Sequence, residues 1–169
     1  KVQHHEAHFA AVLGENQLID TQEPILGVVW DGTGLGNDNQ IWGGEFFIYQ
    51  NYQFRRVNHF GYFPQLMGDK MAQEPRMSAL SLALGNQVME KKLREKFTSV
   101  EWQHYTKQLQ ANGLQTSSAG RLFDAVASLL GLIDKASYEG EAALRLETSA
   151  ADYIQQYGYD CLRSYGITS

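Results

Sequence analysis

The sequence contains little cysteine, little proline and no long apolar run. Its single cysteine, Cys161, excludes a framework of disulfide bonds and fits a reducing compartment. Three prolines in 169 residues, with 43% apolar and 20% charged residues, are typical of an ordinary globular protein with a core. No run of about 18 apolar residues could cross a membrane, and no signal peptide is recognisable. We therefore expect a cytoplasmic protein without a membrane partner.

Positive charge is also scarce. The formal net charge at pH 7 is −5, and the lysines and arginines form no cluster. A nucleic-acid binder needs concentrated positive charge to neutralise phosphates, so we expect no nucleic-acid partner. The chain starts at Lys1 rather than at a methionine, and we therefore expect it to be a segment of a longer protein.

Two histidines four residues apart stand near the start of the chain. On a helix, His4 and His8 share one face and can reach one metal ion. The apolar strand pattern of residues 25–30 then ends in Asp31. Two imidazoles and a carboxylate suit a divalent metal such as zinc or iron. Two alternatives stay open, because such a pair is often only structural and because His5 could replace His4 in a different rotation.

Glycines follow this strand and recur in the next one. Residues 32–36 read Gly-Thr-Gly-Leu-Gly, and a Gly-Gly pair at 43–44 interrupts a second apolar strand pattern. Backbone amides of a glycine-rich turn can hold a phosphate, and the missing β-carbon allows a ligand to approach closely. Residues 32–36 match neither common phosphate-binding fingerprint, so an ordinary turn is the alternative there, and a β-bulge is the alternative at the Gly-Gly pair.

The remaining pattern predicts three strands followed by helices. The strands, expected to form an antiparallel meander, span residues 25–30, 41–49 and 52–60. The helices span residues 2–16, 70–84 with a restart at Pro75, 86–97, 101–112 after a capping box at 98–101, 119–130 capped by Ser117 or Ser118, and 140–157. Helix 119–130 is apolar nearly all round, so we expect Leu122, Phe123, Val126 and Leu130 in the core.

Five blocks of the sequence, in order, resemble the carboxy-terminal part of the hydrogenase-maturation carbamoyltransferases of the HypF type. They are residues 2–8, 27–36, 41–46, 116–131 and 138–143. The resemblance implies a domain similar to the catalytic subunit of tRNA threonylcarbamoyltransferase, with the α/β fold of the actin/hexokinase/Hsp70-like ATPases (ribonuclease H-like). Residues 1–169 would be a central segment of this fold, truncated at both ends and α+β in character. Residues 1–68 would be its metal and phosphate-loop part and residues 69–169 its helical part.

The resemblance also implies an enzyme, a carbamoyltransferase. Other domains of the parent chain would make carbamoyl-adenylate from carbamoyl phosphate and ATP. This domain would transfer the carbamoyl group to the C-terminal cysteine of a HypE-type maturation protein, on the route to the cyanide ligand of [NiFe]-hydrogenase. His4, His8 and Asp31 would bind the metal, and no catalytic acid or base is assigned. The expected nucleotide-binding residues are Gly32, Thr33, Gly34, Gly36, Gly43, Gly44, Asp124 and Gly140.

The sequence departs from the family pattern at its end. Family members continue into a Ser-Gly-Gly block and a final metal-binding aspartate, and neither occurs before Ser169. We therefore expect the isolated segment to be inactive. An O-carbamoyltransferase and the tRNA-modifying relative are alternative assignments. The acidic charge and the Trp-Gly-Gly-Glu-Phe block at 42–46 argue against the tRNA enzyme. A metal- and partner-binding module without turnover is the third alternative.

Overall fold

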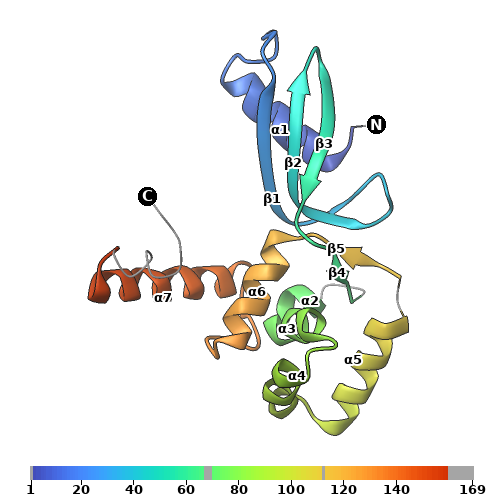
Figure 1. Cartoon of the computed structure of the whole chain (residues 1–169), viewed down its shortest axis with the longest axis vertical. Coiled ribbons are helices and arrows are strands. Elements are labelled where there is room, and N and C mark those ends of the chain that lie inside the picture. The colour runs from blue at the N-terminus through green and yellow to red at the C-terminus, as the bar shows by residue number, and fades with distance from the viewer. Residues whose placement is uncertain (1, 67–69, 112, 160–169) are drawn as a thin grey trace.

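The computed structural model describes residues 2–66, 70–111 and 113–159. Strands and one helix form one end of the molecule, and the remaining helices form the other (Figure 1). The elements are α1 His4–Glu15, β1 Ile25–Leu35, β2 Ile41–Gln50, β3 Gln53–His59, β4 Phe63–Pro64, α2 Lys70–Gln73, α3 Pro75–Ala83, α4 Gln87–Leu93, the 3-10 turn Arg94–Lys96, α5 Ser99–Ala111, β5 Gln115–Thr116, α6 Ala119–Leu129 and α7 Glu141–Tyr157.

The sheet contains the expected meander. β1 pairs antiparallel with β2, and β2 pairs antiparallel with β3. The short strand β5 pairs in parallel with β2 and antiparallel with β4, so the chain returns to the sheet immediately before α6. This return brings Ser118 beside Asp31 and Gly32 of β1, which lie 87 and 86 positions away in sequence.

The glycine segment after Asp31 is not the free loop that the sequence predicted. β1 continues through it to Leu35, and Gly34 and Leu35 pair with Trp42 and Ile41. The register shifts between Trp30 and Gly34, where residues 31–33 of β1 lie opposite the single residue Gly43 of β2, an irregularity of the β-bulge kind. A bulge adds backbone without breaking the strand and often re-aims a side chain near a functional site. Here the bulged stretch contains Asp31.

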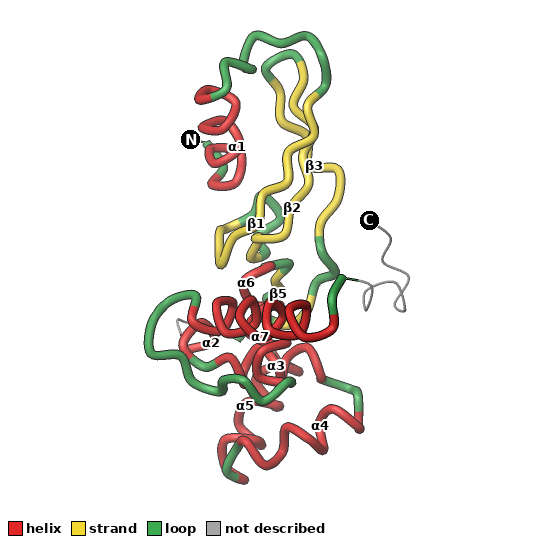
Figure 2. Tube along the Cα trace, turned by 90° about the vertical axis from the view of Figure 1, so that its left-hand side faces the viewer, coloured by secondary structure: helices red, strands yellow, loops and turns green. Residues whose placement is uncertain are grey.

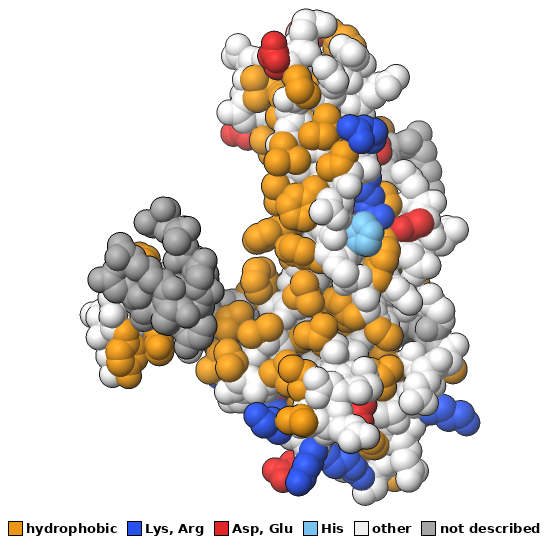
Figure 3. All heavy atoms as spheres, in the orientation of Figure 1, with side chains coloured by type: hydrophobic (Ala, Val, Ile, Leu, Met, Phe, Trp, Pro, Cys, Tyr) orange, Lys and Arg blue, Asp and Glu red, His pale blue; other side chains and the backbone are white. Residues whose placement is uncertain are grey.

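Helix α1 lies across one face of the meander (Figure 2). Its His5, Phe9 and Leu13 are buried against the strands, while His4 and His8 face outward. The core beneath it contains Phe9, Leu13, Val29, Trp42, Phe47 and Tyr49. On the opposite face, Leu26, Val28 and Trp30 of β1 are more than half exposed, and Figure 3 shows apolar side chains gathered on the sheet. No described helix covers that face.

The helical part follows the predicted boundaries closely. The helix expected at 70–84 is divided at Pro75 into α2 and α3, with proline in the first turn of α3. The capping box is present, because the Thr98 hydroxyl accepts from the Glu101 amide while the Glu101 carboxylate accepts from the Thr98 amide. The main core of this part contains Phe63, Leu66, Met71, Met77, Leu80, Phe97, Tyr105 and Leu109.

The predicted burial of helix α6 is wrong for most of its large residues. Phe123 is 40% exposed, Val126 38% and Leu130 63%, while Leu122 is partly buried. The buried residues of α6 are instead Ala119, Asp124, Ala125, Ala127 and Ser128. Small side chains let α6 approach α3 closely, where Ala125 packs with Ala79 and Ala83. The large residues consequently lie on the other side of α6. No helix among the described residues is both long and apolar enough to cross a membrane.

Candidate metal centre and adjoining cavity

The first turns of α1 present the histidine pair. The Gln3 side chain caps the helix by accepting a hydrogen bond from the Glu6 amide. Phe9 and Leu13 anchor the helix to the sheet, so its rotation is fixed by apolar burial. That rotation leaves His4 and His8 together on the outer face, as the spacing predicts.

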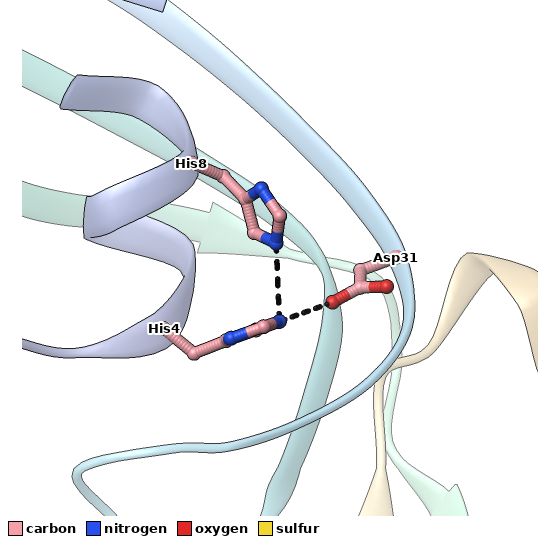
Figure 4. A group of neighbouring side chains, drawn as sticks. All are labelled: His4, His8 and Asp31. Atoms are coloured by element: carbon pink, nitrogen blue, oxygen red, sulfur yellow. Dashed lines mark hydrogen bonds and ion pairs between the residues drawn. The ribbon is translucent and has the colours of Figure 1, made fainter. Parts of the chain in front are cut away.

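Asp31 on β1 completes a three-residue cluster with the two histidines (Figure 4). His4 Nε2 lies 2.8 Å from Asp31 Oδ2 and 3.1 Å from His8 Nε2. Ligand atoms of all three residues lie within 4.8 Å of one another. Donors bound to one tetrahedral zinc ion at 2.0–2.1 Å are about 3.3 Å apart, so this cluster fits a divalent cation. The His4 and Asp31 side chains are 49% and 29% exposed, which leaves room for further ligands on the solvent side.

The Asp31 carboxyl is held in its charged form. Burial alone would raise its pKa, but hydrogen bonds from the Gly32 amide and from His4 outweigh burial, and the pKa lies below its usual value. The Gly32 amide donates to Oδ1 at 2.6 Å, so Oδ2 is the oxygen directed at the histidines. An ionised carboxylate beside two imidazoles is the form that binds a metal.

His5 does not replace His4 as a candidate ligand, which was the alternative for a different rotation of the helix. It is fully buried on the inner face of α1, with its ring against Trp42. The Gln3 amide nitrogen donates to Nδ1 at 3.0 Å, so in the neutral ring the proton lies on Nε2, 3.8 Å from Asp31 Oδ2. Burial, the largest effect, lowers the pKa of His5. His5 therefore packs behind the cluster as a neutral imidazole.

The predicted nucleotide-binding glycines divide into two groups. At Gly34, Gly36, Gly43 and Gly44 the space of a β-carbon is filled by the chain itself. A β-carbon at Gly34 would lie 2.5 Å from His5 Cε1 and 2.7 Å from His4 Cδ2. The neighbours are the Trp42 indole at Gly36, the Asp31 carbonyl and Ser118 at Gly43, and Phe60 and the Ser117 carbonyl at Gly44. These four do not line the cavity described next, and a side chain at any of them would collide with neighbouring atoms of the chain itself.

The second group lines a cavity of about 750 Å³ that also reaches Asp31. Gly32 and Thr33 contribute from β1, Asp124 from α6, and Gly140 from the start of α7. Gly140 has φ +81°, in the left-handed region that favours glycine. Burial raises the pKa of Asp124 to about 6, although the nearby Arg121 acts in the opposite direction. Asp31 of the candidate metal cluster and four of the predicted nucleotide-binding residues thus line one cavity.

Ser118 fixes the contact between α6 and β1, a role that the sequence did not reveal beyond a helix cap. Its hydroxyl lies 3.1 Å from the Asp31 carbonyl and 2.7 Å from the Gly32 carbonyl, and it accepts from the Arg121 amide at 3.1 Å. The neighbouring Ser117 hydroxyl donates to Glu45, a fully buried carboxylate. Glu45 also accepts from the Gly43 and Gly44 amides.

Arg56 completes this buried network from β3. Its Nε donates to the second Glu45 oxygen, and its guanidinium lies 3.9 Å from the centre of the Trp42 ring. Burial alone would raise the pKa of Glu45, but the hydrogen bonds from Arg56, Ser117 and the amides lower it below its usual value. The network around Glu45 therefore joins β2, β3 and the residues before α6, and Ser118 links these residues to β1.

Comparison with known proteins shows the family of this chain. Residues 27–167 match a family model described as carbamoyltransferase, Kae1-like domain, second subdomain. The chain is 41% identical over 155 residues to the carbamoyltransferase HypF of Rhodobacter capsulatus, covering 89% of this chain and 21% of the relative. It is 36% identical over 174 residues to a HypF homolog of Cupriavidus necator, covering 98% of this chain and 43% of the relative.

Solved structures give the same result. One, described as full-length HypF in the phosphate- and nucleotide-bound form, matches with a TM-score of 0.76 and 36% identity, over 86% of this chain and 19% of that one. The T. kodakarensis HypF structure matches with a TM-score of 0.72 and 32% identity, over 87% and 21%. The chain thus spans about a fifth to two fifths of the length of these relatives. It belongs to the Kae1-like domain family of HypF carbamoyltransferases, as the second subdomain of that domain.

Proposed function

We propose that the protein containing this chain transfers a carbamoyl group from carbamoyl-adenylate to the C-terminal cysteine of a HypE-type maturation protein. In this proposal other domains of the parent chain supply the carbamoyl-adenylate in the cytoplasm, and the product leads to the cyanide ligand of [NiFe]-hydrogenase. The observation that supports it best is the position of Asp31. Its carboxylate faces the two histidines, and the same residue lines the cavity that contains the predicted nucleotide-binding residues.

The reaction exchanges one bond to the carbamoyl carbon for another. The cysteine sulfur attacks that carbon after loss of its proton, the bond from the carbon to the phosphate oxygen breaks, and AMP leaves with the electron pair. A zinc or iron ion held by His4, His8 and Asp31 would polarise the carbonyl and offset the phosphate charge. A mixed anhydride needs both effects, since negative charge develops on its oxygens as the sulfur attacks.

The chain's own residues would orient the substrate. Ser118 holds the backbone of Asp31 and Gly32 against the start of α6, and so joins the strand that carries Asp31 to one wall of the cavity. Asp124 lines the same cavity, where its carboxyl would accept hydrogen bonds from the ribose hydroxyls. Such fixed geometry contributes to rate by holding the reacting groups close and aligned.

The test is transfer of labelled carbamoyl to the partner's cysteine by the full-length parent protein. We expect His8→Ala to abolish transfer or reduce it strongly while its thermal melt stays cooperative. His104→Ala, at an exposed histidine of α5, is the matched control and should transfer normally. Normal transfer by His8→Ala would reject the proposal. Transfer of the label to a small-molecule hydroxyl instead of the cysteine would point to an O-carbamoyltransferase.

A further inference from the structure

Among the described residues that line the cavity, one side chain is cationic. The proposed reaction gives it no role, and it is not among the predicted binding residues. It is Arg121, in the first turn of α6, whose side chain is 13% exposed. The other charged lining residues are the carboxylates of Asp31, Asp124, Glu139 and Glu141. An arginine so enclosed normally has partners for most of its five N–H donors.

Two of the three guanidinium nitrogens of Arg121 donate no hydrogen bond, although they are buried. Nη1 lies 3.0 Å from Asp124 Oδ2, yet Nε and Nη1 are buried without a hydrogen bond, and so is Asp124 Oδ2. The ion pair therefore lacks the hydrogen-bond geometry that would compensate for burial of both groups. A buried guanidinium in this state favours an additional anionic partner.

The guanidinium of Arg121 lies beside the residue that follows Asp31 of the candidate metal cluster. Nη2 lies 3.8 Å from the point where a β-carbon of Gly32 would stand, and Gly32 directly follows Asp31. Gly120 packs against the same backbone, with its β-carbon position 3.0 Å from Gly32 Cα. The start of α6, which carries partial positive charge, therefore lies against the backbone of Asp31 and Gly32, on the same side as the guanidinium.

We propose that Arg121 binds the phosphate of the nucleotide, exchanging its contact with Asp124 for phosphate oxygens when substrate enters. This inference rests on the proposed function and adds a phosphate-binding residue to its site. A guanidinium matches phosphate geometry with two parallel N–H donors, so the new contact is better aligned than the old one. The exchange also frees the Asp124 carboxyl for the ribose. Burial raises the pKa of Asp124 to about 6, so burial makes the charged form of this carboxyl less favourable than it is in water.

The experiment measures binding of AMP and of adenosine to this chain by NMR titration, with EDTA present so that no metal contributes. We expect Arg121→Gln to raise the Kd for AMP at least about tenfold and to leave the Kd for adenosine unchanged, since adenosine lacks the phosphate. Arg55→Gln, which removes the same charge from an exposed position on β3, should change neither value. Arg121→Lys, which keeps the charge without the fork, should give an intermediate Kd for AMP.

An unchanged Kd for AMP in Arg121→Gln, or an equal loss of affinity for AMP and adenosine, would overturn the phosphate-binding role of Arg121. Neither result would reject the nucleotide site itself. Failure of the wild-type chain to bind either ligand would instead reject the nucleotide site of the proposed function, and this inference with it. Salt provides a measurement that needs no variant. Binding of AMP to the wild-type chain should weaken as ionic strength rises while binding of adenosine does not, and equal responses would contradict the proposal.

Discussion

At the scale of single residues, the site depends on side chains 27 positions apart in sequence that meet at one point. His4 and His8 come from the outer face of α1, and Asp31 comes from the bulged end of β1. Two residues outside the cluster support it: Gly34 leaves space for the imidazoles, and the Ser118 hydroxyl bonds to the Asp31 carbonyl. Each of these roles can be tested by one substitution.

Gly34→Ala tests whether the histidines need this glycine. The new β-carbon would contact His5 and His4, so their rings must shift. We expect zinc affinity to fall at least about tenfold, as when an orienting contact is lost, and stability to fall by about 1–3 kcal/mol from overpacking. Gly61→Ala is the control, because its β-carbon would meet no atom within 4 Å. Unchanged zinc affinity in Gly34→Ala, measured by chelator competition, would show that the ring positions do not depend on Gly34.

Asp124→Asn tests the buried carboxyl through pH. Its pKa is about 6 in the folded chain against 3.8 as the ordinary value, so the folded state binds the proton more tightly than the unfolded state. Between these values, lowering the pH therefore stabilises the fold through this group, by at most about 3 kcal/mol. The wild type should gain stability relative to Asp124→Asn when urea melts at pH 7 and pH 5 are compared. Asp152→Asn, at an exposed carboxylate of α7, should behave as the wild type does, and a parallel response of Asp124→Asn would contradict the raised pKa.

At the scale of elements, the sequence predicted the helices and the meander because their signals are local. Periodicity, Pro75 and the capping box at 98–101 all act within a few residues of each boundary. The glycine stretch of β1 was expected to be a loop, since pairing with Trp42 and Ile41 depends on a distant strand. The two-residue strands β4 and β5 give no local pattern for the same reason. The sequence indicated His4, His8 and Asp31, but the role of Arg121 depends on tertiary packing.

Helix α6 offers a direct test of the corrected burial. Phe123 is 40% exposed, whereas Phe47 on β2 is 1% exposed in the core under α1. A buried phenylalanine replaced by alanine costs about 3–5 kcal/mol, so we expect that loss for Phe47→Ala and less than about 2 kcal/mol for Phe123→Ala. Urea denaturation of the two variants measures the difference. Equal losses of unfolding free energy in the two variants would mean that the face of α6 that carries Phe123 is buried.

At the scale of the whole molecule, the site lies where the sheet and the helical part meet. The Ser118 hydroxyl bonds to β1, and the buried Glu45 on β2 binds Ser117, so two contacts join the start of α6 to the sheet. The cluster itself joins α1 to β1. A metal bound there would therefore connect the first helix, the sheet and, through the Asp31 backbone, the helical part.

The function proposed above requires that His4, His8 and Asp31 bind a metal, and the zinc affinity of this chain tests that requirement. The measurement is competition with a chromophoric chelator for the wild type, His8→Ala and His104→Ala. We expect the wild type and His104→Ala to bind zinc with the same affinity, and His8→Ala to lose at least about tenfold in affinity. Equal affinity in all three proteins, or no binding by the wild type, would contradict that requirement.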